Sequence, residues 1–308
     1  MIHEFHITTA SNNTDGLLAD LNQRAKWIHQ QGYNISVDID QMQIPDIDKL
    51  IVKLQGSQFG QVFRDEDILC VFKHQVAEVI AEHILTQWED KLIWKEIGRT
   101  GRTLSEEEKQ FVYDKTVEFL HACQDNEKLN RLLYFGRKSR ITNRVLEYIN
   151  ENNYLLVEGF ITFCLRDYLA EIKFAVEIAY EELRSEKEYN DFITLLRFYV
   201  ETQTPKITEV NVLMTSNSFF YLWDGNGMKI DDRYMDYYVN ELRFNEINFD
   251  DVLISILITI APRRIILHNG GDLSRQSVKT ILKVFSDRIR ICSGCPQCHH
   301  ILNNGFQQ

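Results

Sequence analysis

The chain has few of the residues that break helices. Its 308 residues include only 14 glycines and four prolines, and scarce breakers favour long helices over a sandwich of many short strands. Long apolar runs are also missing: the longest, residues 252–261, is interrupted by Ser255 and Thr259. Such a run is too short to cross roughly 30 Å of hydrocarbon. We therefore expect a largely helical protein without a membrane-spanning helix.

The amino terminus lacks the features of a secretory signal. Its first residues, MIHEFHITTA, contain neither a basic leader nor an apolar centre, so we expect the protein to be cytoplasmic and its thiols to be reduced. Only six cysteines occur. Cys70, Cys123 and Cys164 are far apart in apolar surroundings, where a free cysteine usually behaves as a small hydrophobe, and we expect them to be packed. The other three crowd into residues 292–298.

The composition is that of an ordinary folded protein, and its charge is negative. Hydrophobic residues make up 44% and charged residues 26% of the chain, which excludes a disordered or fibrous protein. A formal net charge of −11 argues against a protein whose whole surface binds nucleic acid. The excess acid lies in residues 1–205, whereas residues 206–308 are balanced and contain a basic region at residues 263–290.

Periodicity predicts a mostly helical first part with a small sheet. Residues 2–39 read as strand, helix and strand, and helical spacing follows at residues 73–97, 138–151 and 159–202. Ser105 with Glu108 three residues later matches a capping box, which predicts a helix over residues 106–123. Pro205 marks the expected domain boundary.

Alternation replaces helical spacing after Pro205. Residues 207–214 and 218–223 read as strands, and the DGNG turn that follows is typical of hairpins. The next segments are expected as helix 233–243, helix 250–260, strand 264–268, helix 272–286 and strand 288–291. The last three predict a parallel strand pair with a right-handed crossover. The sequence thus predicts a mixed α+β fold with two domains: a mostly helical domain with a small sheet over residues 1–205, and a small α/β domain with a cysteine-rich tail over residues 206–308.

Two stretches resemble a known family. Residues 159–214, with EKEYNDFITLLRFYVETQ, and residues 247–268, with LISILITIAPRRIILH, are similar to the YtxC-like family from spore-forming Firmicutes. The resemblance implies a bacterial cytosolic protein linked by name to sporulation. It brings no assigned activity, cofactor or catalytic residue.

The segment CSGCPQCHH is the sharpest local chemical feature. Cys292, Cys295 and Cys298 follow successive CxxC spacings, and His299 or His300 could complete a tetrahedral Cys3His zinc site. Iron–sulfur binding is disfavoured because no fourth cysteine follows. A redox role is disfavoured because the ten residues after Cys298 include Asn303, Asn304 and Gly305, which disfavour the helix that would lower a thiol pKa. A reduced tail without any ligand is the remaining alternative.

Two sets of basic residues are candidates for binding nucleic acid or another anion. Each set shares one face of an expected helix, and Tyr134 and Phe135 beside the first could stack on bases. The sets are Arg137, Arg140 and Arg144, and Arg275, Lys279 and Lys283. Solvated helix faces on a folded protein are the alternative explanation for both sets.

A catalytic site has only weak candidates in the sequence. Gly270 and Gly271 precede a helix start, where an anion can bind, and His268 could act as a base beside them. Asp272 fits better as the cap of that helix, and a lone histidine fits better as a packed residue. The chain has no GxSxG, HExxH or GKS/GKT motif.

These observations leave three hypotheses. The first is a noncatalytic cytosolic protein that acts through a protein partner. The second is a zinc-stapled binder of nucleic acid or another polyanion that uses the basic helix near the cysteines. The third is an enzyme that uses His268 and the glycine loop.

Overall fold

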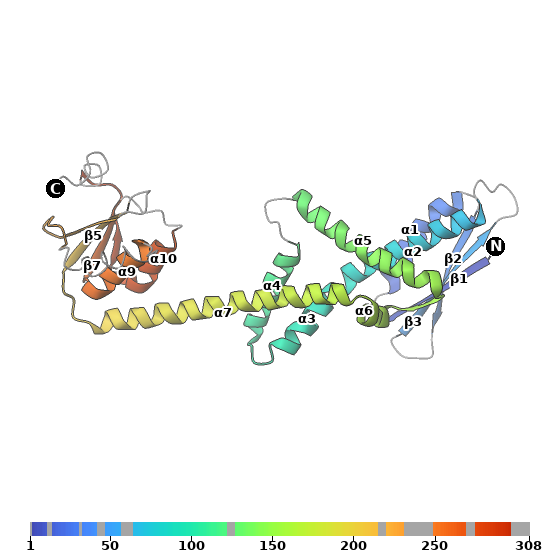
Figure 1. Ribbon diagram of the computed structural model, residues 1–308, viewed down its shortest axis with the longest axis horizontal. Coiled ribbons are helices and arrows are strands. Elements are labelled where there is room, and N and C mark those ends of the chain that lie inside the picture. The colour runs from blue at the N-terminus through green and yellow to red at the C-terminus, as the bar shows by residue number, and fades with distance from the viewer. Residues whose placement is uncertain are drawn as a thin grey trace, which may run out of the picture. The chain divides into compact units, whose positions relative to one another are not determined.

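The computed structural model describes residues 2–10, 14–30, 33–41, 47–56, 64–121, 127–214, 220–230, 249–268 and 275–296. Contacts divide the chain into two compact units, which we call unit 1 (Met1–Arg184) and unit 2 (Ser185–Gln308). Each unit contains its own cluster of buried apolar side chains. The division falls inside helix α7 (Arg166–Thr202), which therefore contributes residues to both units (Figure 1).

Unit 1 contains a four-stranded sheet with the spatial order β2-β3-β1-β4. Its strands are β1 (Ile2–Ala10), β2 (Tyr33–Gln41), β3 (Ile47–Gly56) and β4 (Tyr154–Leu156). Strand β3 pairs antiparallel with both β1 and β2, and the short β4 pairs parallel with β1. The sequence predicted β1 and β2 but missed β3, although Leu50, Val52 and Leu54 alternate along it and are all buried.

Six further helices lie in the described part of unit 1. They are α1 (Thr14–Gln30), α2 (Asp65–Gln87), α3 (Glu89–Thr100), α4 (Glu106–His121), α5 (Glu127–Glu151) and α6 (Val157–Cys164). The single helix expected over residues 73–97 is in fact two helices, α2 and α3, which meet at Trp88. No glycine or proline marks this break, so apolar periodicity alone does not reveal it.

The capping box at the start of α4 is confirmed. The backbone N–H of Ser105 donates to Glu108 Oε2 over 2.9 Å, and the backbone N–H of Glu108 donates to Ser105 Oγ over 3.3 Å. This reciprocal pair satisfies two N–H groups that a helix start otherwise leaves without acceptors. It explains why the local sequence predicted the start of α4 correctly.

Unit 2 contains a second four-stranded sheet, with the order β6-β5-β7-β8. Its strands are β5 (Glu209–Met214), β6 (Phe220–Asp224), β7 (Arg264–His268) and β8 (Ile289–Ile291). Helices α9 (Phe249–Ile260) and α10 (Gln276–Phe285) lie side by side along this sheet (Figure 1). The helix expected over residues 233–243 lies outside the described residues.

The connections in unit 2 follow the predicted α/β pattern. Strands β5 and β6 pair antiparallel, whereas β5 with β7, and β7 with β8, pair parallel. Parallel neighbours need a crossover, which α9 supplies for the first pair and α10 for the second. The expected mixed α+β fold is confirmed, with a largely helical first unit and an α/β second unit.

The last turns of α7 pack with unit 2. Ile193 and Val200 are buried in its apolar cluster, and Tyr189 and Leu196 pack against that cluster. The division between the compact units therefore falls inside α7, and the domain boundary at Pro205 stays a prediction. Among the described residues, no helix is both long enough and apolar enough to cross a membrane.

Candidate metal centre

The register of two parallel strands brings His268 beside Cys292. Leu267 of β7 pairs with Ile291 of β8, so the residues that follow them, His268 and Cys292, lie at the same edge of the sheet. The backbone N–H of Cys292 donates to the carbonyl oxygen of Leu267 over 2.8 Å, which continues the strand ladder by one bond. Cys292 is therefore fixed next to the end of β7.

A glycine turn then brings Cys295 to the same place. Gly294 has a φ of +121°, a conformation that L-residues with side chains rarely adopt. Its backbone N–H donates to Cys292 Sγ over 3.4 Å. After this turn, Cys295 Sγ lies 3.5 Å from His268 Nδ1.

Three metal-ligand atoms converge as a result. One ligand atom each from His268, Cys292 and Cys295 lies within 4.8 Å of the other two. In a tetrahedral zinc site, Zn–S bonds of about 2.3 Å and Zn–N bonds of about 2.0 Å place sulfur and nitrogen about 3.5 Å apart. The separation between Cys295 Sγ and His268 Nδ1 has this value, so the pair is spaced as two ligands of one ion.

The other nitrogen of His268 is held by Asn211. His268 Nε2 lies 2.9 Å from Asn211 Oδ1, and Asn211 Nδ2 donates to the carbonyl oxygen of Asp224 over 3.2 Å. His268 is only 4% exposed, and its ring stacks on that of Trp223. Burial lowers the pKa of His268, although the carboxylate of Glu209 acts in the opposite direction. The neutral imidazole, which is the form that binds metals, is therefore favoured.

Asn211, Trp223 and His268 share one face of the sheet. Asn211 pairs with Trp223 across β5 and β6, and it is two residues from Leu213, the partner of His268. Because side chains alternate along a strand, these three residues project away from the face on which Val212 and Leu267 join the apolar cluster with α9 and α10. The candidate metal centre therefore lies on the face opposite these helices.

The structure brings two of the expected ligands together and places His268 beside them. Cys292 and Cys295 come together as the CxxC spacing suggested, whereas Cys298, His299 and His300 lie outside the described residues. The sequence alone suggested that His268 is a packed residue or a base, and it indicated no role for Asn211. The expected parallel pairing of residues 264–268 with 288–291 held the missing signal, because its register places His268 beside Cys292.

The remaining cysteine predictions were partly wrong. Cys70 and Cys164 were expected to be packed, but both are exposed. On α2, Ile68 and Phe72 take the buried positions on either side of Cys70, and Cys164 ends α6 at the wall of a cavity. Cys123 lies outside the described residues.

The first set of predicted anion-binding residues lines one cavity of unit 1. Arg137, Arg140 and Arg144 border a space of about 260 Å³ between α5 and the start of α7. Arg137 is only 3% exposed and donates to Glu89, so its guanidinium belongs to the interior. Arg140 pairs with Glu171 over 2.6 Å, and Arg144 pairs with carboxylates on both sides of the cavity. Anion binding here stays a prediction.

The second set lies on or beside α10 in unit 2. Lys279 and Lys283 are exposed on this helix, and Arg275 precedes its first turn. Lys283 Nζ lies 4.7 Å from the ring centroid of Tyr189. Polyanion binding by this set also stays a prediction, and the glycine loop at residues 270–272 lies outside the described residues.

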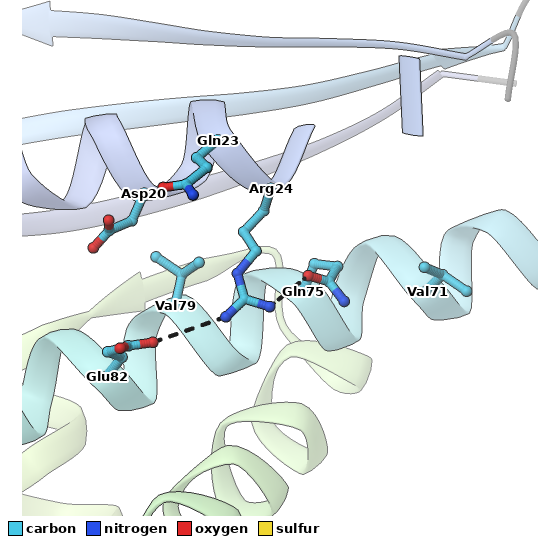
Figure 2. A pocket seen from close by; sticks show the side chains of 7 residues that line it. All are labelled: Asp20, Gln23, Arg24, Val71, Gln75, Val79 and Glu82. Atoms are coloured by element: carbon cyan, nitrogen blue, oxygen red, sulfur yellow. Dashed lines mark hydrogen bonds and ion pairs between the residues drawn. The ribbon is translucent and has the colours of Figure 1, made fainter. Parts of the chain in front are cut away.

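A larger cavity of about 700 Å³ lies between α1 and α2 in unit 1 (Figure 2). Arg24 reaches from α1 toward α2, where it donates to Gln75 over 3.1 Å and to Glu78 over 2.8 Å. Figure 2 also shows its contact with Glu82, at 3.8 Å. Arg24 therefore links α1 to α2 through these contacts. We assign this cavity no ligand.

Comparison with known proteins places the chain in a family. The model of the YtxC-like family matches residues 74–290. The chain belongs to the YtxC-like family. It is also 27% identical to the "Uncharacterized protein YtxC" of Bacillus subtilis (strain 168) over 161 residues, which cover 52% of this chain and 56% of that relative. No solved structure matches. The family match includes Asn211 and His268 but ends two residues before Cys292.

Proposed function

We propose that this protein is a noncatalytic interaction protein whose second unit is stapled by a zinc ion. The observation that carries the proposal is the convergence of His268, Cys292 and Cys295, whose ligand atoms lie within 4.8 Å of one another. Two thiolates and one imidazole suit Zn²⁺, which is borderline-soft. The ion joins the end of β7 to the segment after β8, so it stabilises the edge of the sheet.

The contacts of His268 support a structural role over a catalytic one. Its Nε2 contacts Asn211, its Nδ1 faces Cys295, and the ring is buried against Trp223. A general base needs a nitrogen that can reach a substrate. The residue on which the enzyme hypothesis depended therefore has both nitrogens directed toward protein groups.

An apolar stripe on α7 supports the interaction role. We use "α7 stripe" for Phe192, Leu195, Phe198 and Tyr199, which recur at helical spacing within unit 2 and are each more than half exposed. The opposite side of the same turns packs with the core of unit 2. Exposed apolar patches of this kind mark protein-binding surfaces.

Two of the basic residues at 263–290 make contacts within unit 2, whereas Lys279 and Lys283 stay exposed on α10. Arg264 pairs with Glu209 at 3.3 Å, and Arg288 donates to the carbonyl oxygens of Pro262 and Val200. A salt-dependent shift with DNA or RNA would favour the polyanion hypothesis, because neutralised phosphates release counterions.

Family resemblance supplies the proposed setting. We place the protein in the cytoplasm of sporulating Firmicutes, where it would act through a protein partner. Capture from extracts of sporulating cells tests this setting. Full-length protein should retain a partner that the double variant Leu195→Ser/Phe198→Ser does not, and the same proteins retained by both would contradict a role for the α7 stripe.

Metal analysis of the purified full-length protein tests the zinc site. We expect one zinc per chain under reducing conditions, a loss of zinc in Cys295→Ser, and unchanged zinc in Cys164→Ser. Cys164 is the matched control because it is an exposed cysteine of unit 1. Wild-type protein that contains no stoichiometric zinc would overturn this site.

A further inference from the structure

We infer that Asn211 is the positioning residue of the metal centre and that it determines which nitrogen of His268 binds the ion. This inference rests on the zinc site proposed above. The observation that carries it is a chain of side-chain contacts that starts at a backbone carbonyl, passes through Asn211 and His268, and ends at Cys295.

The direction of each hydrogen bond follows from the chemistry of the groups. The carbonyl oxygen of Asp224 can only accept, so the Asn211 atom that faces it is the donating Nδ2. The other amide atom, Oδ1, can only accept, so His268 Nε2 must carry the hydrogen at this contact. Neutral imidazole has one N–H, which leaves a lone pair on Nδ1 directed toward Cys295 Sγ at 3.5 Å.

The surroundings hold Asn211 in this orientation. Asn211 is only 6% exposed, and its strand neighbour Trp223 stacks on His268 with ring centroids 4.9 Å apart. A flipped amide would direct its NH2 group at His268 and its oxygen at the carbonyl of Asp224. The fixed amide therefore selects the tautomer that can bind a metal through Nδ1. Comparable outer-shell partners typically contribute 10- to 100-fold to metal affinity.

Two substitutions isolate the acceptor that Asn211 offers to His268. Asn211→Leu and Asn211→Asp both remove the N–H that bonds to Asp224, but only the aspartate keeps an oxygen that can accept from His268. The dissociation constant for zinc is measured on full-length protein by competition with a chromogenic chelator. We expect Asn211→Leu to weaken zinc binding about 10- to 100-fold and Asn211→Asp to restore most of that affinity.

A second measurement needs no substitution. Imidazole ¹⁵N chemical shifts of His268 in the zinc-free full chain report the tautomer directly, and we expect hydrogen on Nε2. The inference is overturned if hydrogen is on Nδ1, if Asn211→Leu binds zinc like the wild type, or if the two variants lose affinity equally. Wild-type protein that binds no zinc would instead overturn the zinc site itself.

Discussion

Each unit contains a cluster of polar side chains built around a buried residue, Glu89 in unit 1 and His268 in unit 2, and the two clusters use their polar groups differently. In unit 1, the carboxylate of Glu89 lies at the start of α3 and is 5% exposed. It accepts from Arg137 Nη1 over 3.1 Å and from the Tyr168 hydroxyl over 2.6 Å, and it lies 2.6 Å from His121 Nε2. Arg137 Nη2 donates to the carbonyl oxygen of Leu120. Donors and acceptors in this cluster face one another.

In unit 2, by contrast, three side chains bring potential metal-ligand atoms within 4.8 Å of one another. His268 Nδ1, Cys292 Sγ and Cys295 Sγ are all metal-ligand atoms, and they converge. In unit 1 a carboxylate is surrounded by donors, which is the arrangement of a closed network. The comparison teaches that burial and polarity alone do not mark a binding site. Convergence of ligand atoms is the feature that distinguishes the candidate site in unit 2 from the cluster in unit 1.

Removal of zinc should produce the largest difference in stability between the two units. A ligand present at about a thousand times its dissociation constant stabilises the folded state by about 4 kcal/mol, so chelation should destabilise unit 2 by about this amount. Hydrogen exchange resolved along the chain is the measurement. We expect faster exchange in β7 and α10 with no change in α2 and α5. Equal changes in both units would contradict a local zinc staple.

Loss of the carboxylate should break the closed cluster of unit 1. Glu89→Gln leaves the guanidinium of Arg137 buried without its counter-charge, and removing one partner of a buried ion pair costs about 3–5 kcal/mol. We expect a loss of about 3 kcal/mol in the free energy of unfolding of unit 1, measured by denaturant titration. The matched control is Glu171→Gln, which removes the exposed pair with Arg140 and should cost less than about 1 kcal/mol. Similar losses in both variants would refute the closed network.

A fall in pH should change the stability of unit 1 by a smaller amount, through protonation of the Glu89 carboxylate. Burial opposes ionisation of Glu89, but contacts with His121 and Tyr168 and the charge of Arg137 outweigh it and hold its pKa below the ordinary value of 4.5. The stabilisation is therefore fully present above about pH 4.5 and is lost as the pH falls through the lowered pKa.

The stability gap between wild type and Glu89→Gln should accordingly shrink in acid. Denaturant titrations of both proteins between pH 7 and pH 2 provide the measurement, because the difference cancels the other carboxylates. A gap that stays constant across this range would contradict the lowered pKa of Glu89.

The sequence predicted what depends on neighbouring residues. The capping box located the start of α4, alternation located β5 and β6, and the break at Pro262 located the start of β7. It joined α2 and α3 into one helix because the break at Trp88 has no local mark. It missed β3, although Leu50, Val52 and Leu54 alternate along this strand.

Long-range pairing limited the prediction of both clusters. Glu89 meets Arg137 and Tyr168 across 48 and 79 residues of chain, and no local pattern joins them. Asn211 meets His268 across 57 residues. The cysteine spacing identified Cys292 and Cys295, whereas His268 required the register of two strands.

Zinc K-edge X-ray absorption of the purified full-length protein tests the central claim most directly. The account predicts a four-coordinate shell with at least two sulfur atoms at about 2.3 Å and at least one nitrogen at about 2.0 Å. The nitrogen contribution should decrease in His268→Ala. A shell without sulfur, or a nitrogen contribution that His268→Ala leaves unchanged, would contradict the proposed metal centre.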